Sequence, residues 1–189
     1  MKRIILAALL LSAVALPVQA ANYVIDTEKA HAFIQFKISH LGYSFVLGRF
    51  NKFTGEFTYD EKNPAASKVS VNIDPASIDS AHAERDKHLR GKDFFDVDKF
   101  TTAKFVSTSY TESAGGKAVL KGDLTLHGVT KNIAIDVQQV GAGADPWGGF
   151  RRGFTGNTTL TLSDFGINYN LGPAAKTVEM TLVVEGIKK

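Results

Sequence analysis

The side chains best suited to chemistry stand close together in one polar segment, as His82, Glu84, Asp86 and His88. Imidazoles and carboxylates are ligand types that bind zinc and related metals. On an ideal helix the two histidines, six residues apart, point about 120° from each other, and the i, i+4 spacing of paired helical zinc ligands is absent. The sequence therefore predicts no metal here. Two other interpretations stay open: hydrogen bonds to strand ends, with Arg85 taking part, or contacts of Arg85 and His88 with a ligand's head group.

Other catalytic or phosphate-binding patterns are missing from the chain. No G-x-S-x-G motif occurs, and no helical pattern follows the glycines at 141–143 and 148–149, unlike in a phosphate loop. His127 is interpreted as a turn histidine, and His31 and His40 flank one expected strand, where histidines commonly bond strand ends. We therefore expect a protein that is not an enzyme and needs no cofactor.

The segment that carries the polar cluster is expected to be the chain's one short helix, near residues 80–90. Asp79 or Ser80 is a suitable N-cap, and Gly91 is a suitable residue to follow the helix. Glu84 with His88 and Asp86 with Arg90 have the favourable i, i+4 order of acid before base. The next apolar residues, Phe94 and Phe95, are expected to anchor the segment.

Strict alternation of apolar and polar residues dominates the rest of the chain and predicts β-strands. Eight or nine strands are expected, around 23–27, 34–38, 53–59, 69–73, 103–111, 118–127, 131–140, 153–162 and 176–187. Short turn sequences such as Asp60–Pro64 and Ser113–Gly116 connect consecutive strands. The pattern predicts an all-β, antiparallel, up-and-down barrel of about eight strands, because closure removes exposed sheet edges.

Three glycines fall in phase with the apolar face of their strands: Gly55, Gly122 and Gly156. Such a glycine either lets a strand coil sharply or leaves room inside the barrel. Both interpretations stay open. The second predicts an interior that is not fully packed, and a barrel of eight strands can hold one small ligand.

Composition limits the classes of function. Residues 1–20 have the basic start, short apolar run and small-residue end of a secretory signal peptide, which leaves 21–189 as a single domain. Lys2 and Arg3 fall in that segment, so 20 of the 22 Lys and Arg remain against 19 Asp and Glu, a net charge of +1. This balance gives no support for a nucleic-acid partner. There is no cysteine, hence no disulfide or lipoprotein anchor, and no stable membrane insertion is expected.

An ordered set of segments through the mature chain resembles the YceI-like family of exported proteins. The matching segments are His31–Phe33, His40–Ser44, Gly48–Phe50, His82–Arg90, Gly122–Lys131 and Asp145–Gly148. The resemblance implies an extended lipocalin-like barrel in the bacterial periplasm. It also implies that the barrel sequesters or transports an amphiphile with a long apolar tail, typically a polyisoprenoid such as a quinone precursor or a prenyl phosphate.

The expected ligand site is a cavity lined from many strands. Apolar side chains expected to line it are Phe36, Ile38, Tyr43, Phe45, Phe57, Val71, Ile73, Phe94, Phe105, Leu124, Leu126, Ile135, Trp147, Phe154, Met180 and Leu182. The stretches 41–53 and 141–152 are interpreted as two flaps near one barrel mouth. Arg85, His88, Arg151 and Arg152 are the head-group candidates, although a solvated loop would also explain the last two.

Three alternatives stay open on these residues. The chain could be an enzyme that acts on an isoprenoid or lipid through the cluster from His82 to His88. It could be a stress-related scaffold whose barrel is fully packed. A homodimer is also left open.

Overall fold

The computed structural model describes residues 20–29 and 31–189. The expected signal peptide lies outside the described residues except for Ala20, so it stays a prediction. Eleven strands are present in the described part: β1 Ala21–Ile25, β2 Phe33–His40, β3 Ser44–Phe50, β4 Phe53–Tyr59, β5 Lys68–Ile73, β6 Ile78–Asp79, β7 Ala103–Glu112, β8 Lys117–Leu126, β9 Val129–Ala144, β10 Phe150–Thr161 and β11 Thr177–Lys188. One α-helix, α1, spans Ala83–Arg90, and short 3-10 helices lie at 64–66, 75–77, 114–116, 162–165 and 173–175.

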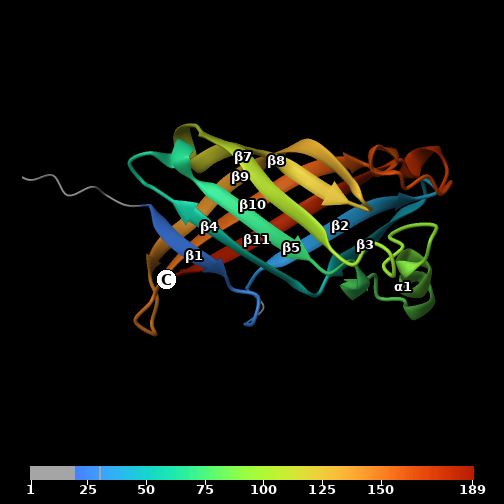
Figure 1. The fold of residues 1–189 in the computed structure, drawn as a ribbon, viewed down its shortest axis with the longest axis horizontal. Coiled ribbons are helices and arrows are strands. Elements are labelled where there is room, and N and C mark those ends of the chain that lie inside the picture. The colour runs from blue at the N-terminus through green and yellow to red at the C-terminus, as the bar shows by residue number, and fades with distance from the viewer. Residues whose placement is uncertain (1–19, 30) are drawn as a thin grey trace, which may run out of the picture.

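Eight of these strands close into the antiparallel barrel that the alternation predicts. The order is β1-β4-β5-β7-β8-β9-β10-β11, and β1 pairs with β11 to complete the circle. The long strands β9, β10 and β11 give the barrel its elongated shape (Figure 1). The predicted fold class, an eight-stranded all-β barrel with one short helix, is confirmed.

Strand β11 changes partner along its length, and this change extends the barrel beyond its closed section. Its last residues, Gly186 to Lys188, pair with β1, whereas Val178 to Val183 pair with β2. Strand β2 continues into β3 through a hairpin, and β6 pairs with β3 only at Arg49 and Phe50. Helix α1 follows β6 directly, so α1 and the β2–β3 hairpin lie at the same end of the molecule (Figure 1).

The sequence interpretation of two flaps at one mouth is wrong. Residues 44–50 form strand β3, and the stretch 141–152 is strand except for the turn at 145–149. Glycines 141 and 143 hid the alternation, yet their backbones pair with residues 153 and 151 of β10. The two stretches lie at opposite ends of the barrel (Figure 1).

The helix exists where predicted, but its caps and pairs differ. His82 is the N-cap, and its Nδ1 accepts a hydrogen bond from the backbone N–H of Arg85 at 3.2 Å. Gly91 has an extended backbone and not a left-handed one. Instead of pairing with Arg90, Asp86 is buried and accepts bonds from the N–H of Ser80 at 2.8 Å and its hydroxyl at 2.5 Å. His88 lies 2.9 Å from Asp93, and not beside Glu84. These partners, five and six residues away in the sequence, replace the expected i, i+4 pairs.

Most of the in-phase glycines make room for neighbouring side chains, and not for a ligand. A Cβ on Gly122 would lie 2.4 Å from the ring of Phe105, and one on Gly55 would lie 2.7 Å from Ile25. Gly156 differs, because it lines an internal cavity and its Cβ would first meet Ile135 at 3.0 Å. The hypothesis that Gly55 and Gly122 leave empty space is therefore wrong. Aromatic rings lie over strand glycines, a known way to stabilise such positions.

Candidate ligand-binding cavity

Two adjoining apolar chambers lie along the barrel. The inner chamber, about 170 Å³, lies within the closed barrel, and the outer chamber, about 290 Å³, lies towards α1. Both exceed the cavity of about 150 Å³ that binds benzene in an engineered protein core. Five residues line both chambers, so the two adjoin and share part of their walls: Ile34, Ile73, Leu124, Leu160 and Met180.

Aromatic rings fill the end of the barrel that is farther from α1. Tyr23 and Phe57 stack with ring centroids 4.7 Å apart, and Phe154 meets Phe57 edge-on at 5.7 Å. Tyr59 and Tyr110 also meet edge-on, at 6.3 Å, and both line the inner chamber. Such pairs stabilise a core beyond their buried area. The inner chamber therefore ends on a packed aromatic cluster.

Most of the expected lining residues do face this cavity. In the inner chamber are Phe57, Val71, Phe105, Ile135, Phe154 and Leu182. In the outer chamber are Phe36, Ile38, Phe94 and Leu126, and three more line both chambers, Ile73, Leu124 and Met180. Alternation along strands found these positions because residues of one parity share a face. Whether they contact a ligand stays a prediction.

Three expected aromatics lie elsewhere. Tyr43 is 88% exposed, Phe45 59% and Trp147 73%, and none lines a chamber. Phe45 has the opposite parity to Val46, which does line the outer chamber. Trp147 sits in the β9–β10 turn, 5.2 Å from the guanidinium of Arg151. The interpretation that these three border the cavity is therefore not supported by their placement.

Sequence reasoning missed other lining residues. Strand alternation could have identified some of them, whereas others lie outside regular strands. Phe53 and Val69 are in phase with expected residues of the same strands and could have been included. Ile167 and Leu171 come from the irregular segment before β11, where no periodicity exists to place them.

The polar rim of the outer chamber is built around α1. Arg85 and His88 line this chamber, together with Ser39 and His40 from β2. Arg85 donates to the hydroxyl of Ser80 at 2.8 Å and to its carbonyl oxygen at 2.5 Å, which confirms the expected structural role of this side chain. Basic side chains at one rim give an amphiphile's polar or anionic head a place to lie.

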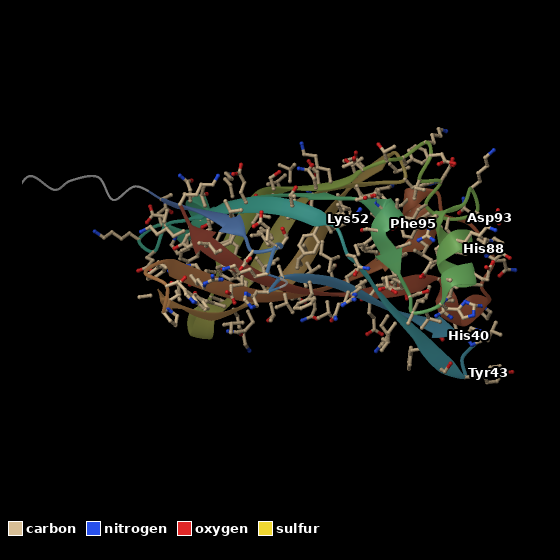
Figure 2. All side chains as sticks on the ribbon, turned by 90° about the horizontal axis from the view of Figure 1, so that it is seen from below. His40, Tyr43, Lys52, His88, Asp93 and Phe95 are labelled. Carbon is tan, nitrogen blue, oxygen red and sulfur yellow. The ribbon has the colours of Figure 1, made fainter. Side chains whose placement is uncertain are left out.

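Aromatic rings pack around this rim. His88 meets Phe94 edge-on at 5.0 Å and Tyr169 at 5.2 Å. Phe95 meets Phe50 edge-on at 5.7 Å and lines the outer chamber with Phe94. The expected anchoring role of Phe94 and Phe95 is confirmed by these contacts. Figure 2 shows His40, His88 and Phe95 at the same end of the molecule.

The other two arginines have partners at the opposite end. Arg151 bonds Asp26 at 2.7 Å, Asp145 at 2.9 Å and Glu185 at 2.5 Å. Burial raises the pKa of Asp26, but hydrogen bonds from Arg151, His31 and the N–H of Lys29 together hold it below its ordinary value. A hydrogen bond from the N–H of Gly149 and one from Arg151 lower the pKa of Asp145. Arg151 therefore holds strand ends together.

Arg152 is the more deeply buried of the pair, at 2% exposure. It pairs with Glu61 and lies over the ring of Tyr59 at 4.1 Å. Tyr59 donates to Glu112 at 2.8 Å, and burial together with that carboxylate raises the pKa of Tyr59 to about 12. Neither Arg151 nor Arg152 lines a chamber, which leaves Arg85 and His88 as head-group candidates.

Several side chains that could take part in metal or acid–base chemistry have structural partners. Among the described residues, one group has the spacing of possible metal ligands, Asp26, His31 and Glu185, and Arg151 already bonds both carboxylates. In the helix cluster, His82 caps α1 and Asp86 binds Ser80. The geometry is that of a binding cavity.

Comparisons with known proteins agree with this arrangement. A model of the YceI-like domain matches residues 23–186. A relative in Shewanella sp. strain ANA-3, called a UPF0312 protein, is 55% identical over 191 residues and covers 100% of both chains. The UPF0312 protein of Shewanella oneidensis is 56% identical over 172 residues, covering 91% of this chain and 90% of the relative.

Solved structures share the fold. The Campylobacter jejuni YCEI protein is 29% identical, covers 81% of this chain and 91% of its own, and superposes with a TM-score of 0.72. BcnA of Burkholderia cenocepacia (23% identity, 85% and 98% coverage, TM-score 0.73) shows the fold alone. So does a polyisoprenoid-binding domain of Saccharophagus degradans (17% identity, 90% and 100% coverage, TM-score 0.66). In residues 20–29 and 31–189, no helix is long and apolar enough to span a membrane.

Proposed function

The chain belongs to the YceI-like family, and we propose that its barrel binds a polyisoprenoid or a similar long-chain amphiphile and shields or carries it in the periplasm. The observation that carries this proposal is the pair of adjoining chambers, which are lined almost wholly by apolar side chains and have Arg85 and His88 at one rim. The polyisoprenoid-binding domain of Saccharophagus degradans, which has the same fold, supports the ligand class. The expected signal peptide at residues 1–20 supports the location.

Burial of an apolar tail supplies enough free energy for such binding. Each buried methylene contributes about 0.8 kcal/mol, so roughly ten carbons contribute about 8 kcal/mol, which corresponds to a micromolar Kd. Ordering of the tail offsets part of this gain for longer ligands. Apolar contacts therefore select for tail length, and the rim around Arg85 and His88 selects the head. Binding of this kind needs no covalent step, which supports a role as a carrier.

Organic extraction of the purified protein, followed by mass spectrometry, tests the proposal. We expect close to one long-chain amphiphile per folded chain. Met180→Trp should remove most of it, because Met180 lines both chambers and the larger ring would obstruct their junction. Thr181→Trp is the matched control, because this neighbouring side chain on β11 is exposed. A folded wild-type protein that carries no lipid and takes up none from a detergent-free suspension would contradict the proposal.

The oligomeric state is a separate question. A homodimer stays a prediction, which light scattering of the purified protein would check.

A further inference from the structure

The tip of the β2–β3 hairpin exposes an unusual run of large apolar side chains. We call Leu41, Tyr43, Phe45 and Leu47 the hairpin tip; each is at least 58% exposed. They alternate with residues that face inward or are polar, so they form the outer surface of the hairpin. Single exposed apolar residues are normal, whereas a contiguous apolar patch marks an interaction site. In Figure 2, Tyr43 lies at the outermost corner of the molecule, beyond His40.

The hairpin tip is continuous with the outer chamber. Val46, between two tip residues, lines that chamber, as do Ser39 and His40 just before the turn. Leu41 lies near the segment before β11: a Cβ added to Gly172, next to Leu171 of the chamber wall, would be 3.7 Å from the Cδ2 of Leu41. Whatever touches the tip is therefore beside the cavity's polar rim.

The charge around the hairpin favours an anionic partner. The hairpin itself, residues 33–50, contains Lys37 and Arg49 and no Asp or Glu, and Arg49 pairs with Asp79 of β6 at 3.7 Å. Lys37 lies over the ring of Phe45 at 4.6 Å while it pairs with Glu179 from β11. Exposed aromatic rings beside basic side chains are typical of segments that lie at the interface of an anionic bilayer.

The shape of the tip argues against a second copy of the chain as its occupant. Specific protein interfaces bury about 600–1,000 Å² from each partner. Aromatic side chains bury about 150–250 Å² each, so two partly exposed aromatics and two leucines offer roughly 600 Å² at most, the lower end of that range. The tip also projects from the barrel. A projecting tip can insert among lipid head groups, whereas a protein partner would need a complementary groove to receive it.

We propose that the hairpin tip docks on the surface of an anionic lipid bilayer, which places the outer chamber against the membrane so that the amphiphile can pass between them. The proposal rests on the proposed ligand-binding function. Docking stays at the interface, because β3 pairs with β6 only at Arg49 and Phe50 and its remaining outer edge has backbone groups that need water. Tyr43, the most exposed of the four, then lies at the depth where tyrosine is favoured.

Vesicle co-sedimentation of the full mature protein tests the docking step. The vesicles are phosphatidylethanolamine with one quarter phosphatidylglycerol, and the protein is first stripped of lipid. We expect the wild type to pellet with these vesicles and less with pure phosphatidylcholine. The variant Tyr43→Ser/Phe45→Ser should lower the partition coefficient at least tenfold. The matched control, Val140→Ser/Trp147→Ser, removes two comparably exposed apolar residues from β9 and the distant turn and should bind as the wild type does.

Three further measurements separate the possible outcomes. The melting temperature of each variant should equal that of the wild type, because the side chains removed are exposed. Met180→Trp should lose ligand yet still bind vesicles, so failure of the cavity proposal does not imitate failure of docking. Tip variants should keep ligand already bound but transfer it to vesicles at least tenfold more slowly. Equal vesicle binding by tip and control variants would overturn the proposal. So would light scattering that shows the tip holding a dimer without any vesicle binding.

Discussion

Arg151 joins residues that are far apart in the sequence at the end of the barrel opposite α1. It bonds Asp26 across 125 positions and Glu185 across 34. Asp26 has a side chain that is only 3% exposed, so its charge needs a partner. The sequence could not predict this cluster, because nothing local connects β1 with the β9–β10 turn. It did identify Arg151, but as a loop residue available to a ligand.

This cluster predicts how stability changes with pH. The pKa values of Asp26 and Asp145 lie below their ordinary values. Their contribution to stability is therefore fully present above about pH 4, the unfolded pKa, and is lost as the pH falls through the lower folded values. Thermal melts of the wild type should show a falling melting temperature below about pH 4.

Without Arg151, the charged carboxylate of Asp26 should destabilise the folded protein instead of stabilising it. In Arg151→Met the carboxylate of Asp26 loses its cation, so at pH 7 we expect a lower melting temperature than that of the wild type. The difference from wild type should shrink as the pH falls, since protonation then relieves the buried charge. Arg49→Met is the control, because Arg49 and Asp79 are a half-exposed pair at 3.7 Å whose loss costs at most about 1 kcal/mol. A difference that does not depend on pH would show that Arg151 acts through packing alone.

At the scale of elements, strand glycines allow aromatic rings to lie flat inside the barrel. The ring of Phe36 covers Gly48, its cross-strand partner, and the ring of Phe105 covers Gly122. The sequence showed these glycines in phase with the apolar face, but phase alone does not tell whether a ring or a void covers them. That depends on the neighbouring strand's register, which the sequence did not provide.

Replacement of a glycine by alanine distinguishes a glycine that is covered by a ring from one that faces open space. In Gly122→Ala the new Cβ would lie 2.4 Å from the ring of Phe105 and 2.6 Å from the carbonyl oxygen of Val106. We expect a loss of about 1–3 kcal/mol in urea unfolding, because the core is overpacked. Gly141→Ala in β9 is the control, since its Cβ would meet nothing within 4 Å, and it should be neutral or slightly stabilising. Equal effects of the two changes would contradict the role assigned to Gly122.

At the scale of the whole molecule, alternation alone was enough to predict the barrel and most of its cavity. Nine of the eleven strands and the helix lie near their expected positions, because a half-buried strand needs a period of two. Strand β3 was missed, since apolar residues on both of its faces erase that period: Phe45 and Leu47 are exposed, and Val46 lines the cavity. Strand β3 also lies outside the closed barrel. Its unusual sequence pattern and its position both fit a functional role for the β2–β3 hairpin.

The length of the cavity predicts a limit on tail length. Along β10, the inner chamber is lined from Phe154 to Leu160, which corresponds to about 20 Å of strand at about 3.3 Å per residue, and the outer chamber adds to this length. A prenyl alcohol series that grows by one isoprene unit should therefore gain about 2–3 kcal/mol per unit after ordering costs, until the tail fills both chambers. Beyond that length, Kd should stay constant. Met180→Trp should move the plateau to shorter tails, because it leaves only the outer chamber accessible, whereas Thr181→Trp should not. Displacement of a fluorescent fatty-acid probe measures each Kd. Two results would show that the tail does not occupy the two chambers in series. One is an affinity that rises without a plateau, and the other is a plateau that Met180→Trp leaves at the same tail length.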